Sequence, residues 1–334
     1  EASIESCTAD FGGSLLVPKG GEATCNAGIV CGNSGSSITD CTAKFTGDAS
    51  IESNGAISFG GAVGSLSGVG ECAVSLVSTE MGGTVKIAQG DEYSDVHVGG
   101  VFGSASNATA SACDALLSGD IEISSNVADG TTNVNVGGVC GKSGMLTAGC
   151  HAEWTESAHV KIASDRSNFG GVTGLTQAES NYAFLVGCYA LCKGRVEIEP
   201  KNGTDYTANA GGIAGTLANS TIAGCTVKAK NIYGHNASSP SLIGVSGIAA
   251  YVVGVSSVSD CKAYATLIRN STVLGTEDAS VTPDNLFGMG MIVGIDAGTT
   301  TVTNCGVGGS FYLGASEKPQ ELILTLDADS YAKG

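Results

Sequence analysis

Charged residues, aromatic residues and proline are all scarce in this chain. Charged residues make up 14% of the 334 positions and aromatic residues 5%, and there are five prolines. No apolar run reaches the 18 residues that a transmembrane helix needs, so the sequence predicts no membrane insertion. A sustained 3.6-residue periodicity is also missing, which indicates β structure rather than helices.

Basic residues are scarcer still. The chain has 15 Lys and Arg against 32 Asp and Glu, for a net charge of -17. Such a surface repels phosphate groups, which excludes nucleic acids and anionic membranes as favoured partners. Divalent cations and neutral glycans are compatible with this charge.

The common motifs of metal, cofactor and nucleotide sites are missing as well. No Cys-x-x-Cys pair and no His-Glu-x-x-His occurs, so we expect no metal site. The glycine-rich phrases do not follow the layouts of dinucleotide-binding or phosphate-binding loops. The sequence therefore predicts no cofactor and no enzyme activity.

Glycine, by contrast, is abundant, with 51 residues, and 42% of the chain is hydrophobic. The glycines do not form a G-X-Y array, which excludes collagen, and the hydrophobic content excludes a disordered chain. The sequence shows no signal peptide and opens at Glu1, inside a repeat and without Met. We therefore expect a processed N-terminus and an exported protein, extracellular or on the cell surface.

A cysteine opens the same short phrase nine times, as in Cys7-Thr-Ala-Asp-Phe11 and Cys41-Thr-Ala-Lys-Phe45. The steps between these cysteines are 34, 31, 41, 37, 38, 37, 36 and 44 residues. A period in this range is typical of solenoids and propellers. The nine cysteines are Cys7, Cys41, Cys72, Cys113, Cys150, Cys188, Cys225, Cys261 and Cys305.

These cysteines occur once per repeat instead of in local pairs, and the total of 13 is odd. Because a free cysteine behaves as a small hydrophobic residue, we expect a stacked column of buried, reduced thiols. If disulfides form, the four cysteines outside the column are the more favourable partners: Cys25, Cys31, Cys140 and Cys192.

Two further phrases recur. A glycine phrase such as Phe59-Gly-Gly-Ala-Val-Gly64 precedes most of the cysteines, and a strand with a charged centre, such as Ile121-Glu-Ile123, follows five of them. We expect three short strands per repeat: glycine, cysteine and charged-centre. The charged centres alternate in sign, which would place opposite charges on neighbouring turns. They are Glu52, Lys86, Glu122, Lys161 and Glu197.

The glycine phrases that end at Gly64, Gly103, Gly141, Gly174, Gly215 and Gly247 resemble the GLUG repeat of bacterial surface and secreted proteins. Thr221-Ile-Ala-Gly-Cys225 and Val302-Thr-Asn-Cys305 match the second half of that repeat, and the resemblance covers roughly residues 25 to 310. It implies a right-handed parallel β-helix on a cell surface or in the medium, and it carries over no catalytic residue.

The predicted architecture is an all-β, right-handed parallel β-helix of about eight to nine turns with three short strands per turn. Residues 1–314 form the repeat domain, and residues 315–334 form a connector and a strand that acts as a cap or as a donor strand. A β-propeller is the alternative, but its blades need four strands and the sequence supplies three.

One outward face carries the weak candidates for chemistry. Asp114, His151, Glu153 and Tyr189 are expected on neighbouring turns, where they could perform acid/base work or grip a sugar. An ordinary solvated strand face is the simpler interpretation. Acceptor sequons for N-glycosylation stand at Asn107, Asn202, Asn219, Asn236 and Asn270.

Two functions follow. The first is a non-enzymatic extracellular structural protein, a subunit of a surface fibre, coat or adhesin stalk that self-associates head to tail through its solenoid ends. The second is a glycan-binding or polysaccharide-degrading protein that uses the face around His151.

Overall fold

The fold is described from a computed structural model of the chain. The described residues are 3–20, 22–67, 72–90, 94–125, 132–178, 182–199, 207–236, 242–271, 288–314, 319–326 and 331–332.

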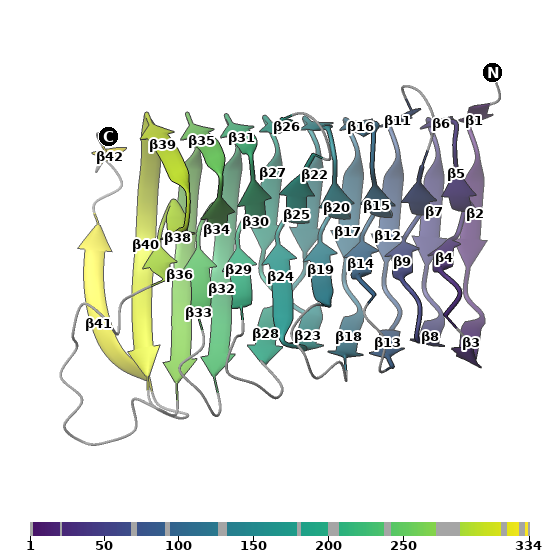
Figure 1. Cartoon of the computed structure of the whole chain (residues 1–334), viewed down its shortest axis with the longest axis horizontal. Helices are drawn as coiled ribbons and strands as arrows, with labels where there is room; N and C mark the ends of the chain where they lie inside the picture. Colours follow the sequence, from purple (N-terminus) through teal and green to yellow (C-terminus); the bar gives the residue numbers. More distant parts are fainter. Residues whose placement is uncertain are drawn as a thin grey trace.

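The chain winds as a parallel β-solenoid with five sheets, here named A to E in the order in which each turn meets them (Figure 1). In every sheet, strands from successive turns pair in parallel, and this confirms the predicted class. No helix in the described part of the chain is long and apolar enough to cross a membrane.

Sheets A and B meet at a sharp corner. Sheet A comprises β1 (Ser3–Glu5), β6 (Ser37–Thr39), β11 (Cys72–Ser75), β16 (Ala108–Ser111), β21 (Leu146–Ala148), β26 (Ala183–Val186), β31 (Ser220–Ala223), β35 (Val255–Ser259) and β39 (Thr299–Thr303). Sheet B comprises β2 (Thr8–Phe11), β7 (Thr42–Phe45), β12 (Ser78–Met81), β17 (Asp114–Leu117), β22 (His151–Trp154), β27 (Tyr189–Cys192), β32 (Thr226–Asn236), β36 (Lys262–Ser271), β40 (Cys305–Gly314), β41 (Pro319–Leu326) and β42 (Tyr331–Ala332).

Sheet C contains the strands with charged centres. Its members are β3 (Ser14–Gly20), β8 (Asp48–Ser53), β13 (Val85–Gln89), β18 (Asp120–Ser125), β23 (His159–Ala163) and β28 (Arg195–Glu199). In later turns a single long strand, β32, continues from sheet B and contacts β28.

Sheets D and E are the two halves of the glycine phrase. Sheet D comprises β4 (Cys25–Gly28), β9 (Ile57–Gly60), β14 (Val96–Gly99), β19 (Asn133–Gly137), β24 (Arg166–Gly170), β29 (Thr207–Gly211), β33 (Leu242–Ser246) and β37 (Met289–Gly290). Sheet E comprises β5 (Cys31–Ser34), β10 (Val63–Leu66), β15 (Phe102–Ala105), β20 (Cys140–Ser143), β25 (Thr173–Gln177), β30 (Ala214–Ala218), β34 (Ala249–Val253) and β38 (Val293–Asp296).

The prediction of three strands per turn is therefore wrong. From β1 to β30, six turns each contribute a separate strand to all five sheets. The glycine phrase yields two strands because it bends at its glycine pair, and the sheet A strand carries no repeated phrase that would have revealed it.

At the C-terminal end, β41 pairs antiparallel with β40 of the same chain, and β42 pairs with β40 as well. Of the two roles predicted for this segment, the pairing within one chain corresponds to the cap. Of the predicted connector, residues 315–320, the first four lie outside the described residues, and Pro319 and Gln320 belong to β41.

The predicted cysteine column exists, with one correction. Cys72 lies in sheet A, where it pairs in register with Ala108. The position between Cys41 and Cys113 belongs to Val77: Ser78 N–H donates to Cys41 O, and Asp114 N–H donates to Val77 O. The spacing through Val77 is 36 and 36 residues instead of 31 and 41. The cysteine row is therefore Cys7, Cys41, Val77, Cys113, Cys150, Cys188, Cys225, Cys261 and Cys305.

The row lies directly after the corner between sheets A and B, which explains its preference for cysteine. The residue before each member has a positive φ, for example 54° at Asp40 and 58° at Gly149. Each thiol of the row then donates to the carbonyl two residues before it, as Cys41 Sγ does to Thr39 O at 3.3 Å. A thiol fills this corner without a large side chain and satisfies a carbonyl there.

All 13 cysteines are free, and ten of them are buried; Cys7, Cys25 and Cys31 are partly exposed. Cys140 and Cys192, the suggested disulfide partners, are thiols within the core, where burial raises the pKa of each to about 12.

The glycine pair is required by close backbone contact between turns. A Cβ on Gly138 would overlap the carbonyl oxygen of Gly171 on the next turn and press on the Trp154 side chain. Trp154 is fully buried, packs on Phe169 with ring centroids 5.2 Å apart, and donates its indole N–H to Gly171 O.

Two glycine substitutions test this account. Gly138→Ala should lower the free energy of unfolding by roughly 3 kcal/mol, because the added methyl group meets backbone that cannot move aside. Gly149→Asn should change it by less than about 0.5 kcal/mol, because a Cβ there meets nothing within 4 Å and Asn304 occupies the same corner position after β39, the last strand of sheet A. Urea denaturation followed by circular dichroism measures both, and equal losses would contradict the proposed packing.

Candidate functional site

The four residues predicted for the outward face do come together on sheet B. Asp114, His151 and Tyr189 are register partners on β17, β22 and β27, so they form one row across three turns. Glu153 lies two residues beyond His151 on the same strand and therefore on the same face.

Side-chain contacts fix how the three residues of this row lie relative to one another. The distance from His151 Nδ1 to Asp114 Oδ1 is 3.5 Å, and the rings of His151 and Tyr189 lie 5.0 Å apart at an interplanar angle of 41°. The imidazole is thus held between a carboxylate on one turn and a phenol ring on the next. Together the three side chains offer hydrogen-bond donors, acceptors and an aromatic surface.

The next row on the same face places one leucine on each side of Glu153. Glu153 lies in register between Leu116 and Leu191, and its carboxylate accepts from Lys193 Nζ at 2.8 Å. Leu116 is among the exposed large hydrophobic side chains. Two leucines beside a polar row suit a ligand with one hydroxylated edge and one apolar face, as in a sugar ring.

Placing Cys72 in sheet A also changes which residues of the third turn lie on the outward face of sheet B. Ser78 and Glu80 of β12 take the positions that phrase matching would give to Ala73 and Ser75. Glu80 then pairs with Lys44 of the preceding turn, with 3.1 Å between Nζ and Oε2. This ion pair is a feature that the misplaced phrase concealed.

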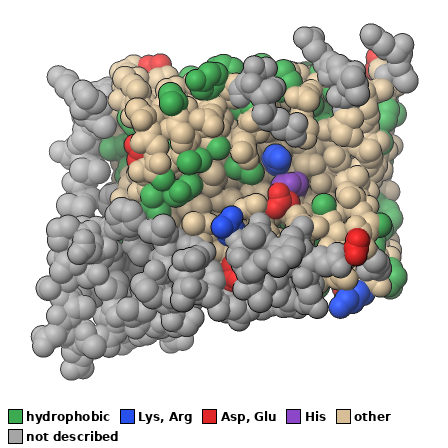
Figure 2. Space-filling view, in the orientation of Figure 1, with side chains coloured by type: hydrophobic (Ala, Val, Ile, Leu, Met, Phe, Trp, Pro, Cys, Tyr) green, Lys and Arg blue, Asp and Glu red, His purple; other side chains and the backbone are tan. Residues whose placement is uncertain are grey.

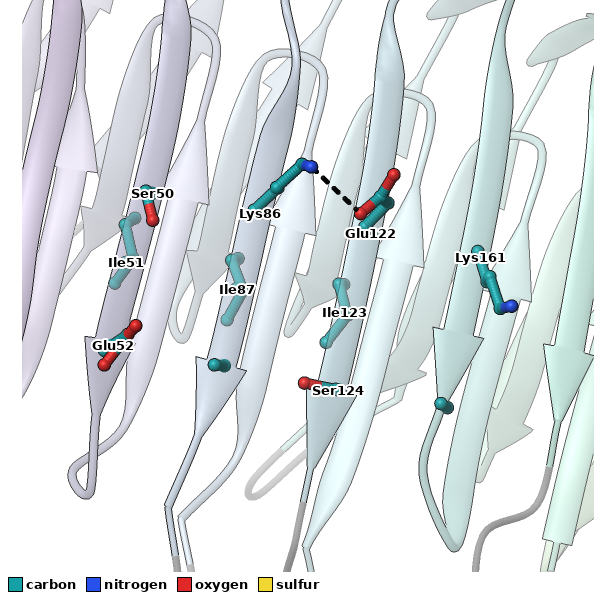
Figure 3. A pocket seen from close by; sticks show the side chains of 11 residues that line it. Ser50, Ile51, Glu52, Lys86, Ile87, Glu122, Ile123, Ser124 and Lys161 are labelled. Carbon is teal, nitrogen blue, oxygen red and sulfur yellow. Dashed lines mark ion pairs between the residues drawn. The ribbon is translucent and has the colours of Figure 1, made fainter.

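Sheet C carries a shallow outward pocket (Figure 3). Lys86 and Glu122 face one another from β13 and β18 with 3.4 Å between Nζ and Oε2. Small side chains, Ala88, Ser124 and Ala163, lie in the next row and leave the space that the pocket occupies.

The predicted alternation of charge holds for four of its five members. Lys86, Glu122, Lys161 and Glu197 are successive register partners. Glu52 is wrong: it pairs with Ala88, and Ser50 is the partner of Lys86. The charged-centre motif of the second turn lies two residues later in the register than the motifs of the later turns. A shift of two residues leaves the same side chains facing inward, so the hydrophobic pattern alone does not reveal it.

A buried polar ladder, which the sequence analysis missed, follows the outward side of sheet D. The side chain of Asn168 donates to Asn135, Asn209 donates to Asn168, and Asn135 Nδ2 lies 3.0 Å from His97 Nδ1. These four side chains are register partners on β14, β19, β24 and β29 and are at most 8% exposed. Only one residue of each sheet D strand takes part in the ladder, so no recurring sequence motif predicts it.

His97 terminates the ladder as a neutral acceptor. Burial, with a smaller effect of nearby Lys142, lowers its pKa to about 4, against an opposing effect of Asp95. Figure 2 shows the corresponding face as mostly uncharged, with a histidine between a basic and an acidic side chain. Protonation of Nδ1 would break the hydrogen bond to the Asn135 amide.

Two of the five sequon asparagines, Asn107 and Asn219, have side chains among the described residues. Asn107 is exposed. Asn219 is exposed, but its side-chain oxygen accepts from Val255 N–H at 3.1 Å, so it supports a corner. Asn202 lies outside the described residues, and so do the side chains of Asn236 and Asn270.

Comparison of the chain with family models, curated proteins and solved structures finds no match. The likeness to GLUG repeats stays a prediction. Among the described residues, no group of three or more His, Cys, Asp or Glu side chains is arranged to hold a metal ion.

The His97 ladder predicts a specific pH dependence. The folded-state pKa lies below the ordinary value of about 6.5, so the unfolded chain takes up the proton first. Stability should therefore fall as the pH drops from about 6.5 to about 4, by up to roughly 3 kcal/mol from this group. Urea midpoints measured between these pH values give the slope.

His97→Asn is the matched variant, because asparagine occupies the same row in the next three turns. It should be folded and should show a shallower fall over the same pH range. An unchanged slope would mean that other groups set the dependence.

Proposed function

We propose that the protein is a non-enzymatic structural protein of the cell surface or medium, a β-helical subunit that stacks end to end into a fibre, coat or adhesin stalk. The observation that carries this proposal is the exposure of the first turn. Ile4, Cys7 and Phe11 are only partly buried, although their register partners in the second turn are at most 1% exposed.

A further turn placed on this end would bury those side chains. Phe11 stacks on Phe45 with ring centroids 5.8 Å apart and nearly parallel planes, so its other ring face points toward the open end. Another copy of the chain can supply such a turn, since its own strands have the same spacing of about 4.8 Å.

The five sheets differ in how accessible their edge strands are at the two ends of the solenoid. At the first turn, β3 carries Pro18 and Lys19 and a register shift, which are features that discourage edge pairing. At the opposite end, β41 covers sheet B. Sheets A and E end in β39 and β38, and these edges favour contact through sheets A and E.

The candidate acid/base residues support this non-enzymatic proposal. Asp114 has a side chain 65% exposed, and Glu153 is already paired with Lys193. Acid/base catalysts usually work in enclosed sites from which water is excluded. Solvated, partnered side chains are better suited to binding.

Electron microscopy of the purified chain tests the assembly. We expect particles whose lengths are multiples of one solenoid. Phe11→Asp should shorten them to single solenoids, because a charge at the open end opposes burial. Leu16→Asp, at an outward position that is 70% exposed, should leave them unchanged.

Circular dichroism of both variants separates loss of assembly from loss of folding. Single wild-type solenoids at every concentration would refute end-to-end stacking.

Neutral glycan binding on sheet B is the second candidate, favoured by the row of Asp114, His151 and Tyr189 with Leu116 and Leu191 in the next row. Binding to immobilised neutral polysaccharides should weaken about tenfold in His151→Ala and in Tyr189→Ala, since each removes about 1.4 kcal/mol of contact. Thr226→Ala, at the next position in the same row, is the control. Release of reducing ends by the wild type would indicate an enzyme instead.

A further inference from the structure

Val77 divides the cysteine row into a pair and a run of six. Cys7 and Cys41 form the pair at the first two turns, and the other six thiols follow beyond Val77. The pair differs from the run in exposure, because Cys7 is partly exposed, whereas the thiols beyond Val77 are at most 1% exposed.

The two thiols of the pair are close enough to join. Thr42 N–H donates to Cys7 O at 2.8 Å, and Thr8 and Thr42 are register partners. The two cysteine Cα atoms are therefore about one strand spacing apart, roughly 4.8 Å, within the range that disulfides span.

The first turn differs from the later turns in the number of turns that pair with it among the described strands. A disulfide draws the two Cβ atoms to about 3.8 Å, closer than the strand spacing, so one turn must shift. Among the described strands, those of the first turn pair on one side only, whereas the turns that carry the later thiols up to Cys261 have a paired turn on both sides.

We propose that Cys7 and Cys41 form a disulfide that fastens the first turn to the second in the presence of a low-molecular-weight disulfide, while the six thiols beyond Val77 stay reduced. This oxidation takes place within a single chain whose first turn is uncovered, and a second copy stacked on that end would shield Cys7 from the oxidant.

The reaction needs one equivalent of the oxidant. The Cys7 thiol loses its proton, and its thiolate attacks one sulfur of the oxidant, forming a mixed disulfide and releasing one thiol. The Cys41 thiol then loses its proton, and its thiolate attacks the Cys7 sulfur, releasing the second thiol. Two protein thiols are oxidised, and one disulfide is reduced to two thiols.

Cys25 and Cys31 are the accessible rivals, since both are partly exposed in the same turn. The Cys31 thiol donates to Asn33 O at 3.1 Å on its own strand. A link between Cys7 and either rival is therefore a distinct outcome that peptide mapping resolves.

The test treats the folded full chain with excess oxidised glutathione and maps disulfides by mass spectrometry after digestion without reductant. We expect one cross-link, between the peptides of Cys7 and Cys41. Amide hydrogen exchange in the strands between them, β2 to β6, should slow about tenfold or more, because the first turn can no longer detach.

Cys41→Val is the matched variant, because valine already occupies this row at Val77, where it is 1% exposed. In this variant Cys7 should stop at the mixed disulfide with glutathione, and exchange should not slow. Cys25→Ser should keep the cross-link.

Three results would overturn the proposal in protein with a native circular dichroism spectrum. They are Cys7 and Cys41 both free after oxidation, Cys7 linked to Cys25 or Cys31, and cross-links among the six thiols beyond Val77.

Discussion

The parallel hydrogen-bond ladder between turns is the constraint on which the rest of this structure depends. Each strand satisfies its backbone groups on the turns before and after it, so every residue has a fixed neighbour about 4.8 Å away. Rows of equivalent side chains then run along the solenoid, and one unsuitable residue affects its partners on both sides. The glycine pair shows the strictest case, since the carbonyl oxygen of Gly171 leaves no room for a Cβ on Gly138.

The same constraint explains how far the sequence could be interpreted. A period near 36 residues and alternating apolar positions were enough to predict a parallel solenoid. Matching the recurring cysteine motif misplaced Cys72, however. Cys72 lies in sheet A and Val77 lies at the corner, and in the sequence alone Cys72 looks like the corner residue of a repeat of unusual length. The corner is set by the residue before the row, which adopts a positive φ in every turn whether it is Asp40, Leu76 or Gly149. Backbone conformation, not residue identity, defines the repeat there.

The candidate site could be predicted where the register between strands of successive turns could be predicted. Asp114, His151 and Tyr189 came out adjacent because their turns differ little in length between the cysteines. Lys193 was missed as the partner of Glu153 because it lies just beyond β27, where the repeat has no phrase. The asparagine ladder was missed for another reason. Its members are outward by strand parity, and they are buried because the chain bends at the glycine pair between sheets D and E; the sequence analysis expected one strand there and so missed their burial.

The cysteine row links folding to position along the solenoid. Within the solenoid a thiol fills a tight corner and donates to a carbonyl, and valine replaces it at Val77 because most of its value there is volume. At the first turn the same residue type is partly exposed beside a second thiol, and there its chemistry becomes available. A repeat protein can therefore use one residue in one row both as packing in its interior and as a reactive group at its end. What differs between the two is the neighbouring turn, which only the three-dimensional stacking specifies.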